Sequence, residues 1–164
     1  MKFKDIKKLI GFGHYRVDGN WDDINRYIER YNLQLEPDFQ RGHVWTITQQ
    51  IEFCEFFLRG GLCPPILLNM PGWQDDWKGD FVVVDGLQRL NALKQLIENK
   101  IKVFGHFLKD IEGGENYVEW YATFPIFINN LQTKNDVIRW YLQINGGGTP
   151  HTIEELERVE CLMD

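Results

Sequence analysis

A short apolar run that ends in an acidic residue and a glycine constrains this chain more than any other segment. Residues 81–84 read Phe-Val-Val-Val, which favours a buried β-strand, and Asp85 and Gly86 follow directly. A helical pattern then begins at once, with Gln88 and Arg89 on its first turn. The glycine allows a sharp turn and a close approach of another group. The helix start presents unpaired N–H groups beside an arginine, so the segment is suited to holding an anion such as a phosphate.

The remaining pattern predicts an α+β fold. Helical and strand-like segments follow one another without the regular alternation of a doubly wound sheet. We therefore expect a small mixed sheet surrounded by helices, in a single domain that spans residues 1–164. Hydrophobic periodicity and capping residues predict helices over about 21–31, 46–59, 87–99, 133–144 and 152–163, and strands over about 15–17, 33–35, 66–69, 81–84, 101–107, 117–121 and 124–128.

The charge balance restricts the class of partner. The chain has a formal net charge of −6 and a pI of about 5.2, whereas a protein that binds duplex DNA by itself usually presents a basic face. Tight non-specific binding to DNA is therefore not expected. A local basic site stays open as an alternative, and the residues that would form it are Lys2, Lys4, Lys7, Lys8 and Arg16.

Cysteine usage and hydropathy indicate the compartment. The three cysteines, Cys54, Cys63 and Cys161, are far apart and form no C-x-x-C pair, which indicates reduced thiols. No spacing typical of a zinc site occurs, so we predict no metal bound by the protein alone. The N-terminus has no apolar leader and no run approaches 18 apolar residues, so we expect a soluble, cytoplasmic protein.

Three polar loops, each at the junction of two elements, are the candidate functional segments. The first contains Gln40, Arg41 and His43, the second spans residues 85–89, and the third runs from Asn145 to His151. His43 and His151 are candidates only because each lies beside a polar loop. Motifs of P-loop, Rossmann and α/β-hydrolase proteins are absent from the sequence, so those classes are excluded.

Each loop has a structural and a functional interpretation. Asp85 and Arg89 are four residues apart, so they form either a helix cap with an ion pair or a phosphate site. In the phosphate site, Arg89 would clamp the anion while Asp85 and Gln88 position or activate water. Arg41 either stacks on a ring or is a second clamp. The glycines at 146–148 either end a helix or form an anion nest.

The same three loops resemble a known family. Residues 37–45 (Pro-Asp-Phe-Gln-Arg-Gly-His-Val-Trp) are similar to the Pro-x-Tyr-Gln-Arg-x-x-x-Trp signature of DUF262 proteins. Residues 84–89 (Val-Asp-Gly-Leu-Gln-Arg) resemble the Asp-Gly-Gln-Gln-Arg motif of that family. Residues 145–150 (Asn-Gly-Gly-Gly-Thr-Pro) resemble its later glycine-rich stretch, and the similarity is strongest over residues 33–160.

The resemblance implies a ParB/sulfiredoxin-like fold and a link to phage–host defence. Relatives include modification-dependent restriction enzymes, in which this domain is associated with binding and hydrolysis of nucleoside triphosphates and is usually joined to an HNH-type nuclease. Carried over to this chain, the resemblance implies that Asp85, Gln88 and Arg89 are catalytic and that Mg²⁺ is a candidate cofactor brought by the nucleotide. The nucleotide-binding set would be Gln40, Arg41, Gly86, Asn145, Gly147 and Gly148, with His43 and His151 as further candidates.

Two departures from the family pattern bear on activity. Leu87 stands where the motif has its first glutamine; its spacing suits the apolar face of the helix, so it either packs inward and leaves the site intact or reduces catalysis. The 164 residues leave no room for a nuclease domain, so we do not expect this chain to cleave DNA by itself.

Three functional hypotheses follow from the sequence. The first is a nucleotide-binding domain with hydrolase activity. The second is a nucleic-acid-binding or regulatory module without turnover, acting with a nuclease partner. The third is a degenerate structural protein, which the leucine at position 87 favours. Sulfiredoxin-like chemistry is excluded because the matching loop has no cysteine.

Overall fold

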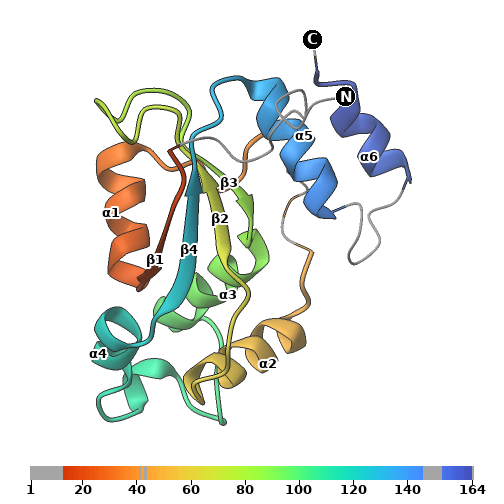
Figure 1. The fold of residues 1–164 in the computed structure, drawn as a ribbon. Coiled ribbons are helices and arrows are strands. Elements are labelled where there is room, and N and C mark those ends of the chain that lie inside the picture. Colours follow the sequence, from red (N-terminus) through yellow and green to blue (C-terminus); the bar gives the residue numbers. More distant parts are fainter. Residues whose placement is uncertain (1–12, 41, 43, 146–152, 164) are drawn as a thin grey trace.

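The computed structural model describes residues 13–40, 42, 44–145 and 153–163 (Figure 1). Four strands form one sheet in the order β1-β4-β2-β3. The strands are β1 (Tyr15–Gly19), β2 (Ile66–Asn69), β3 (Val82–Asp85) and β4 (Phe124–Asn129). The helices are α1 (Trp21–Tyr31), α2 (Ile47–Leu58), α3 (Leu87–Ile97), α4 (Gly114–Asn116), α5 (Lys134–Asn145) and α6 (Ile153–Glu160).

The sheet is mixed, as the sequence predicts. β1 pairs with β4 antiparallel, β4 with β2 parallel, and β2 with β3 antiparallel. A mixed sheet with helices on both sides confirms the α+β class. The finer ParB/sulfiredoxin-like assignment stays a prediction.

Each face of the sheet has its own core. One face places Ile66, Leu68 and Val83 against α1, α2 and α3. The opposite face packs Val82, Val84 and other apolar side chains against α5 and α6, which lie together beside the sheet in Figure 1. The consecutive valines of β3 therefore alternate between two cores, which explains why the strand is a continuous apolar run rather than an alternating one.

β3 is last in the strand order, yet its outer edge is covered. The backbone N–H of Gln34 donates to the Phe81 carbonyl at 2.8 Å, and the N–H of Val83 donates to the Gln34 carbonyl at 3.0 Å. The segment at 33–35 is thus an isolated bridge rather than the short strand that its alternation predicts. It fixes the strand that carries Asp85 from both sides.

Capping residues locate most helices correctly. Asn20 and Asp23 form a reciprocal capping box at α1, and Thr46 and Gln49 do the same at α2. Thr133 Oγ1 accepts a hydrogen bond from the backbone N–H of Asp136 at 3.2 Å, at the start of α5. The predicted helices over 21–31, 46–59, 87–99 and 133–144 are confirmed within one or two residues at each end.

Besides the segment at 33–35, two predicted strands are wrong, and both lie between α3 and β4. Residues 101–107 form a tight turn closed by the bridge between Val103 and His106. The segment expected to be a turn and then a strand is helical instead, with α4 followed by a π-helical turn at Tyr117–Tyr121. Aromatic and β-branched residues favour a strand in isolation, but here Val118 packs into a core beside α2 and α3. Among the described residues, no helix has the length and apolar character needed to cross a bilayer.

Candidate functional site

Gly86 forms the junction between β3 and α3. It is the N-cap of α3, with a φ of 104° and no side-chain cap. A Cβ at this position would lie 2.5 Å from the Cδ1 of Ile66, so both the backbone angle and the space favour glycine. No described residue accepts a hydrogen bond from the N–H groups of Leu87, Gln88 or Arg89. The start of α3 thus offers three backbone donors beside the tip of β3.

Asp85 and Arg89 form an ion pair at this junction. The guanidinium of Arg89 donates to Oδ2 of Asp85 at 2.7 Å, and its side chain is only 11% exposed. The other end of the guanidinium donates to the carbonyls of Pro64 and Pro65, just before β2. Asp85 is 37% exposed and has no described partner for its second oxygen. Arg89 therefore anchors the carboxylate, and the carboxylate presents one oxygen to solvent.

Gln88 connects the start of α3 to the first polar loop. Its Oε1 accepts hydrogen bonds from the backbone N–H groups of Val44 at 2.9 Å and Trp45 at 3.2 Å. Its Nε2 donates to the Gly42 carbonyl at 3.1 Å. One side chain thus satisfies three backbone groups of a loop that forms no regular structure. Gln50 adds a fourth contact, since its Nε2 donates to the Trp45 carbonyl at 3.3 Å.

Gln40 attaches the same loop to the strand. Its Nε2 donates to the Val83 carbonyl at 2.6 Å, on the strand that ends at Asp85. Arg41 and His43, both predicted site residues, lie outside the described residues, but the residues next to Arg41 in sequence, Gln40 and Gly42, are both bonded to the β3–α3 unit. The structure therefore brings the described parts of the first and second loops together.

The third loop is represented only by its first residue. Asn145 ends α5, where its Nδ2 donates to the Tyr141 carbonyl at 2.8 Å. The predicted Gly147, Gly148 and His151 lie outside the described residues, so their part in the site stays a prediction. The ring of Tyr141 packs against Phe39 with 5.4 Å between centroids, which joins α5 to the first loop.

Arg158 and the two prolines are contributors that the sequence did not reveal. From α6, the guanidinium of Arg158 donates to the Asp38 carbonyl at 3.1 Å and the Gln40 carbonyl at 3.5 Å. The acceptors at Pro64 and Pro65 are backbone carbonyls, which leave no signal in a side-chain pattern. The buried Val159 between two charged residues is consistent with an exposed Arg158. The sequence alone does not show that Arg158 is directed toward the first loop.

Leu87, which replaces the first glutamine of the family motif, lies on the buried face of α3. Its side chain is 2% exposed and belongs to the core on the α1–α3 face of the sheet. The apolar replacement therefore packs inward, as one of the two alternatives expects.

A hollow of about 550 Å³ lies at the other end of β3. It is bounded by Val82, by the carboxylates of Glu36, Asp38 and Asp80, and by Lys134 at the start of α5. None of the predicted site residues that the structure describes lines it.

Burial disfavours the thiolate forms of Cys54 and Cys63, the two cysteines nearest α3 in the structure. Burial raises the pKa of the Cys54 thiol to about 12, and burial also raises that of Cys63, although the charge of Arg89 opposes it. All three cysteines are free thiols. Among the described residues, no three His, Cys, Asp or Glu side chains gather where a metal ion would fit.

A comparison with known families places the chain. Residues 23–120 match the sequence profile of the GmrSD restriction endonuclease, N-terminal domain. This chain belongs to that family. The matched segment contains the first and second loops and ends before the third. No curated protein and no solved structure matches at a significant level.

The contacts of Gln88 lead to a first prediction. Replacing Gln88 by alanine removes three hydrogen bonds to the loop at 42–45, and we expect the loop to detach while the sheet stays folded. The global free energy of unfolding should fall by only about 1–2 kcal/mol. Hydrogen exchange at Val44 and Trp45 should accelerate far more than exchange in β3. Equal acceleration at both places would show that Gln88 supports the whole fold. Lys94→Ala, at an exposed position on the same helix, is the control.

Proposed function

We propose that this domain binds a nucleoside triphosphate at the β3–α3 junction and hydrolyses it in the service of DNA restriction or phage defence. The observation that carries the proposal is the pairing of three open N–H donors at the start of α3 with the anchored carboxylate of Asp85. Backbone donors at a helix N-terminus suit phosphate oxygens, and a carboxylate with one oxygen in solvent suits a water molecule. Membership in a family named for restriction endonucleases supports the biological setting.

The geometry suggests a division of roles. The N–H groups of Leu87 and Gln88 bind phosphate oxygens, and Asp85 orients the attacking water and accepts its proton. Water then attacks the terminal phosphorus, the bond to the bridging oxygen breaks, and a nucleoside diphosphate and inorganic phosphate leave. Arg89 acts as a positioning residue, because its donors are directed to Asp85 and to two carbonyls.

The first loop supplies the clamp in this proposal. Gln40 and Gln88 hold the residues on either side of Arg41 against the β3–α3 unit, and we assign Arg41 to the terminal phosphates. We also assign Asn145, Gly147 and Gly148 to nucleotide binding, with His43 and His151 as further candidates. A Mg²⁺ ion that arrives with the nucleotide would neutralise phosphate charge. We also infer a ParB/sulfiredoxin-like class for the fold.

Calorimetric titration of the purified protein with each nucleoside triphosphate and Mg²⁺ tests the proposal, together with measurement of phosphate release. We expect saturable binding and slow release of phosphate. Arg41→Ala should weaken binding at least about tenfold, because a charged hydrogen-bond partner is lost. Arg139→Ala, which removes an exposed guanidinium on α5, should change nothing. A folded protein that binds no nucleotide would rule the proposal out.

The family name also favours a second candidate function, binding of DNA or of a nuclease partner without turnover. Gel-shift assays over a range of salt concentrations discriminate, because contacts to phosphates give a steep loss of affinity with salt. No shift at low salt would remove direct DNA binding and leave the nuclease partner.

A further inference from the structure

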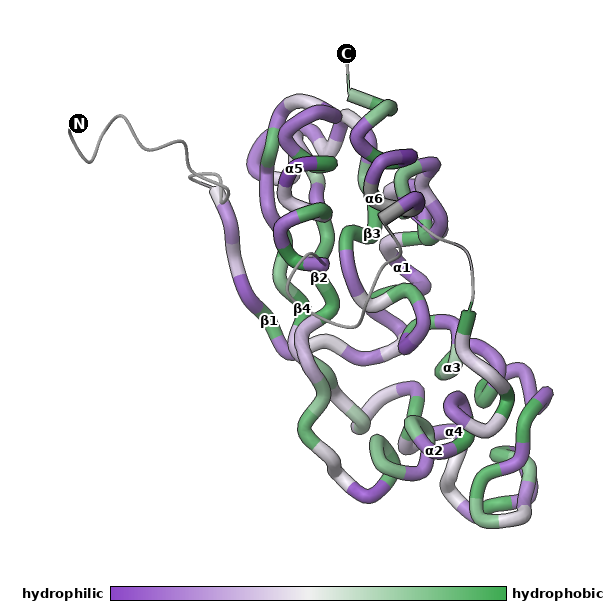
Figure 2. The backbone as a smooth tube through the Cα atoms, turned by 90° about the vertical axis from the view of Figure 1, so that its right-hand side faces the viewer, coloured by the Kyte–Doolittle hydropathy of each residue, from purple (hydrophilic) through white to green (hydrophobic). Residues whose placement is uncertain are grey.

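Within the described part of the chain, β1 is the edge of the sheet that no other segment pairs with. Its one strand neighbour among the described residues is β4, whereas the opposite edge, β3, is covered by the segment at Gln34. Arg16, Val17 and Asp18 are all exposed, and the exposed fraction of Val17 is 41%. In Figure 2 the strand lies at the outside of the molecule, beyond β4. An open edge presents unpaired backbone groups to which another strand can pair.

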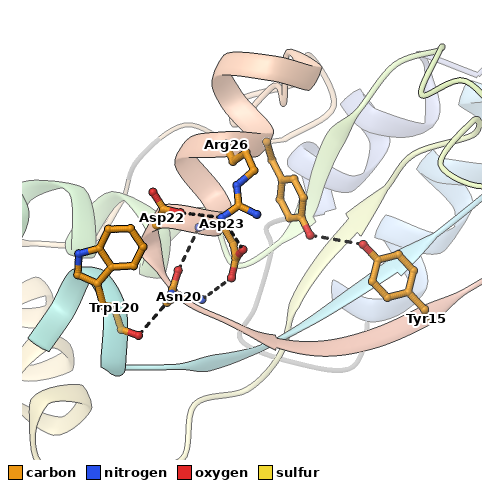
Figure 3. A network of polar contacts seen from close by, with 7 residues as sticks. Tyr15, Asn20, Asp22, Asp23, Arg26 and Trp120 are labelled. Atoms are coloured by element: carbon orange, nitrogen blue, oxygen red, sulfur yellow. Dashed lines mark hydrogen bonds and ion pairs between the residues drawn. The ribbon is translucent and has the colours of Figure 1, made fainter.

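Both ends of β1 are fixed, so the edge is already ordered. The hydroxyls of Tyr15 and Tyr27 are 3.4 Å apart, which holds one end against α1. At the other end Asn20 caps α1, and its Nδ2 donates to the Trp120 carbonyl at 3.3 Å (Figure 3). A second strand would therefore bind a template that needs no further ordering, which lowers the entropic cost of association.

The charged side chains of β1 differ from those of the neighbouring helix α1 in their ion pairing. On α1, Arg26 forms ion pairs with Asp22 and Asp23, at 2.7 and 3.4 Å. Arg16 and Asp18 form no ion pair within the described residues, and the Arg16 guanidinium lies 5.4 Å from the centroid of the Phe127 ring. Charges on an edge strand commonly prevent pairing. Here, however, the two charges are opposite in sign and stand symmetrically on either side of Val17.

We propose that β1 pairs antiparallel with β1 of a second copy of this chain, about a two-fold axis at Val17. In that register Arg16 lies opposite Asp18 of the second copy, Asp18 lies opposite Arg16 of the second copy, and the two valines meet. Opposite charges directly across an antiparallel pair stabilise it, and like charges destabilise it. A two-fold axis makes both ion pairs form together, and the two sheets become one continuous sheet.

Exposed rings beside the strand supply apolar contact area. The π-helical turn that Asn20 contacts exposes Tyr117, Trp120 and Tyr121, with exposed fractions of 42%, 52% and 68%. In the proposed register the Asn20 end of one strand lies beside the His14 end of the other. A strand pair of this length is small compared with the roughly 1,200 Å² of a stable interface, so these rings would provide much of the remaining area.

Charge reversal tests the register directly. Arg16→Asp places two carboxylates opposite each other at both ends, and Asp18→Arg does the same with guanidinium groups. Sedimentation velocity should show that the wild type dimerises and that each single variant dissociates at least about tenfold more readily. An equimolar mixture of the two variants should form a heterodimer, since every new charge then faces an opposite one. The double variant should dimerise with itself for the same reason.

The controls separate register from folding. Circular dichroism should show unchanged folding for each variant, and Lys94→Asp, on α3 away from this edge, should leave dimerisation unchanged. A wild-type protein that stays monomeric up to its solubility limit overturns the proposal. So does a dimer that both single variants leave intact, because its interface must then lie elsewhere. Failure of the mixed variants to associate overturns the antiparallel register. Nucleotide binding plays no part in these measurements.

Discussion

Replacing Arg89 by alanine is expected to lower the free energy of unfolding by about 3 kcal/mol, even though the residue was a candidate ligand for phosphate. The guanidinium is 11% exposed and joins α3 to Asp85 and to the carbonyls before β2. Its loss leaves those carbonyls without a donor and Asp85 without a counter-charge. The value belongs at the low end for a broken buried pair, because Asp85 is 37% exposed and water replaces part of what it loses.

Urea denaturation of three variants measures this effect. Arg89→Lys keeps the charge but not the planar fork, so it should recover only part of the stability. Arg139→Ala, which breaks an exposed pair with Asp136, should cost no more than about 0.5 kcal/mol. If Arg89→Ala is as stable as the wild type but binds no nucleotide, Arg89 is a ligand rather than an anchor, and the assignment of roles is wrong.

The sequence predicted the parts of the fold that local chemistry decides. The capping residues Asn20 and Thr46 and the glycine at 86 mark element boundaries through contacts within a few residues, and each lies where the pattern placed it. The strand predicted over 101–107 is wrong because the alternation there is weak and because packing against α2 and α3 fixes a turn instead. The hydrophobic pattern could not predict the order of the strands in the sheet, because that order depends on contacts between segments far apart in the sequence.

The site shows the same division between local and distant contacts. The sequence identified Asp85 and Arg89 as either a cap with an ion pair or a phosphate clamp, and the structure contains the ion pair. It could not show that Arg89 also binds the carbonyls of Pro64 and Pro65, nor that the Gln88 amide is bonded to loop backbone. These partners are main-chain atoms far away in sequence. Side-chain type therefore located the site, while the tertiary contacts decide which groups are available to a ligand.

Asp85 is 37% exposed and keeps one carboxylate oxygen without a described partner, and we expect the largest effect on turnover at this residue. Asp85→Asn keeps an oxygen that accepts the Arg89 hydrogen bond, so the variant should fold. Because the buried Arg89 guanidinium loses its counter-charge, the free energy of unfolding should fall by about 1–2 kcal/mol. It removes the charge and the ability to accept a proton from water. If the proposed hydrolysis occurs, phosphate release should fall by about 10²–10⁴-fold, which is the usual contribution of a general base.

Nucleotide affinity separates a catalytic role for Asp85 from a structural one. The N–H donors of α3 do not depend on the carboxylate, so the dissociation constant of Asp85→Asn should stay within about tenfold of the wild type, one tenfold step being 1.4 kcal/mol. Asp76→Asn, at an exposed carboxylate paired with Lys78, is the matched control and should alter neither quantity. Unchanged phosphate release would remove Asp85 from the chemistry. Lost binding with intact folding would make the carboxylate part of the binding site, because the backbone donors alone would then be insufficient to hold the phosphates.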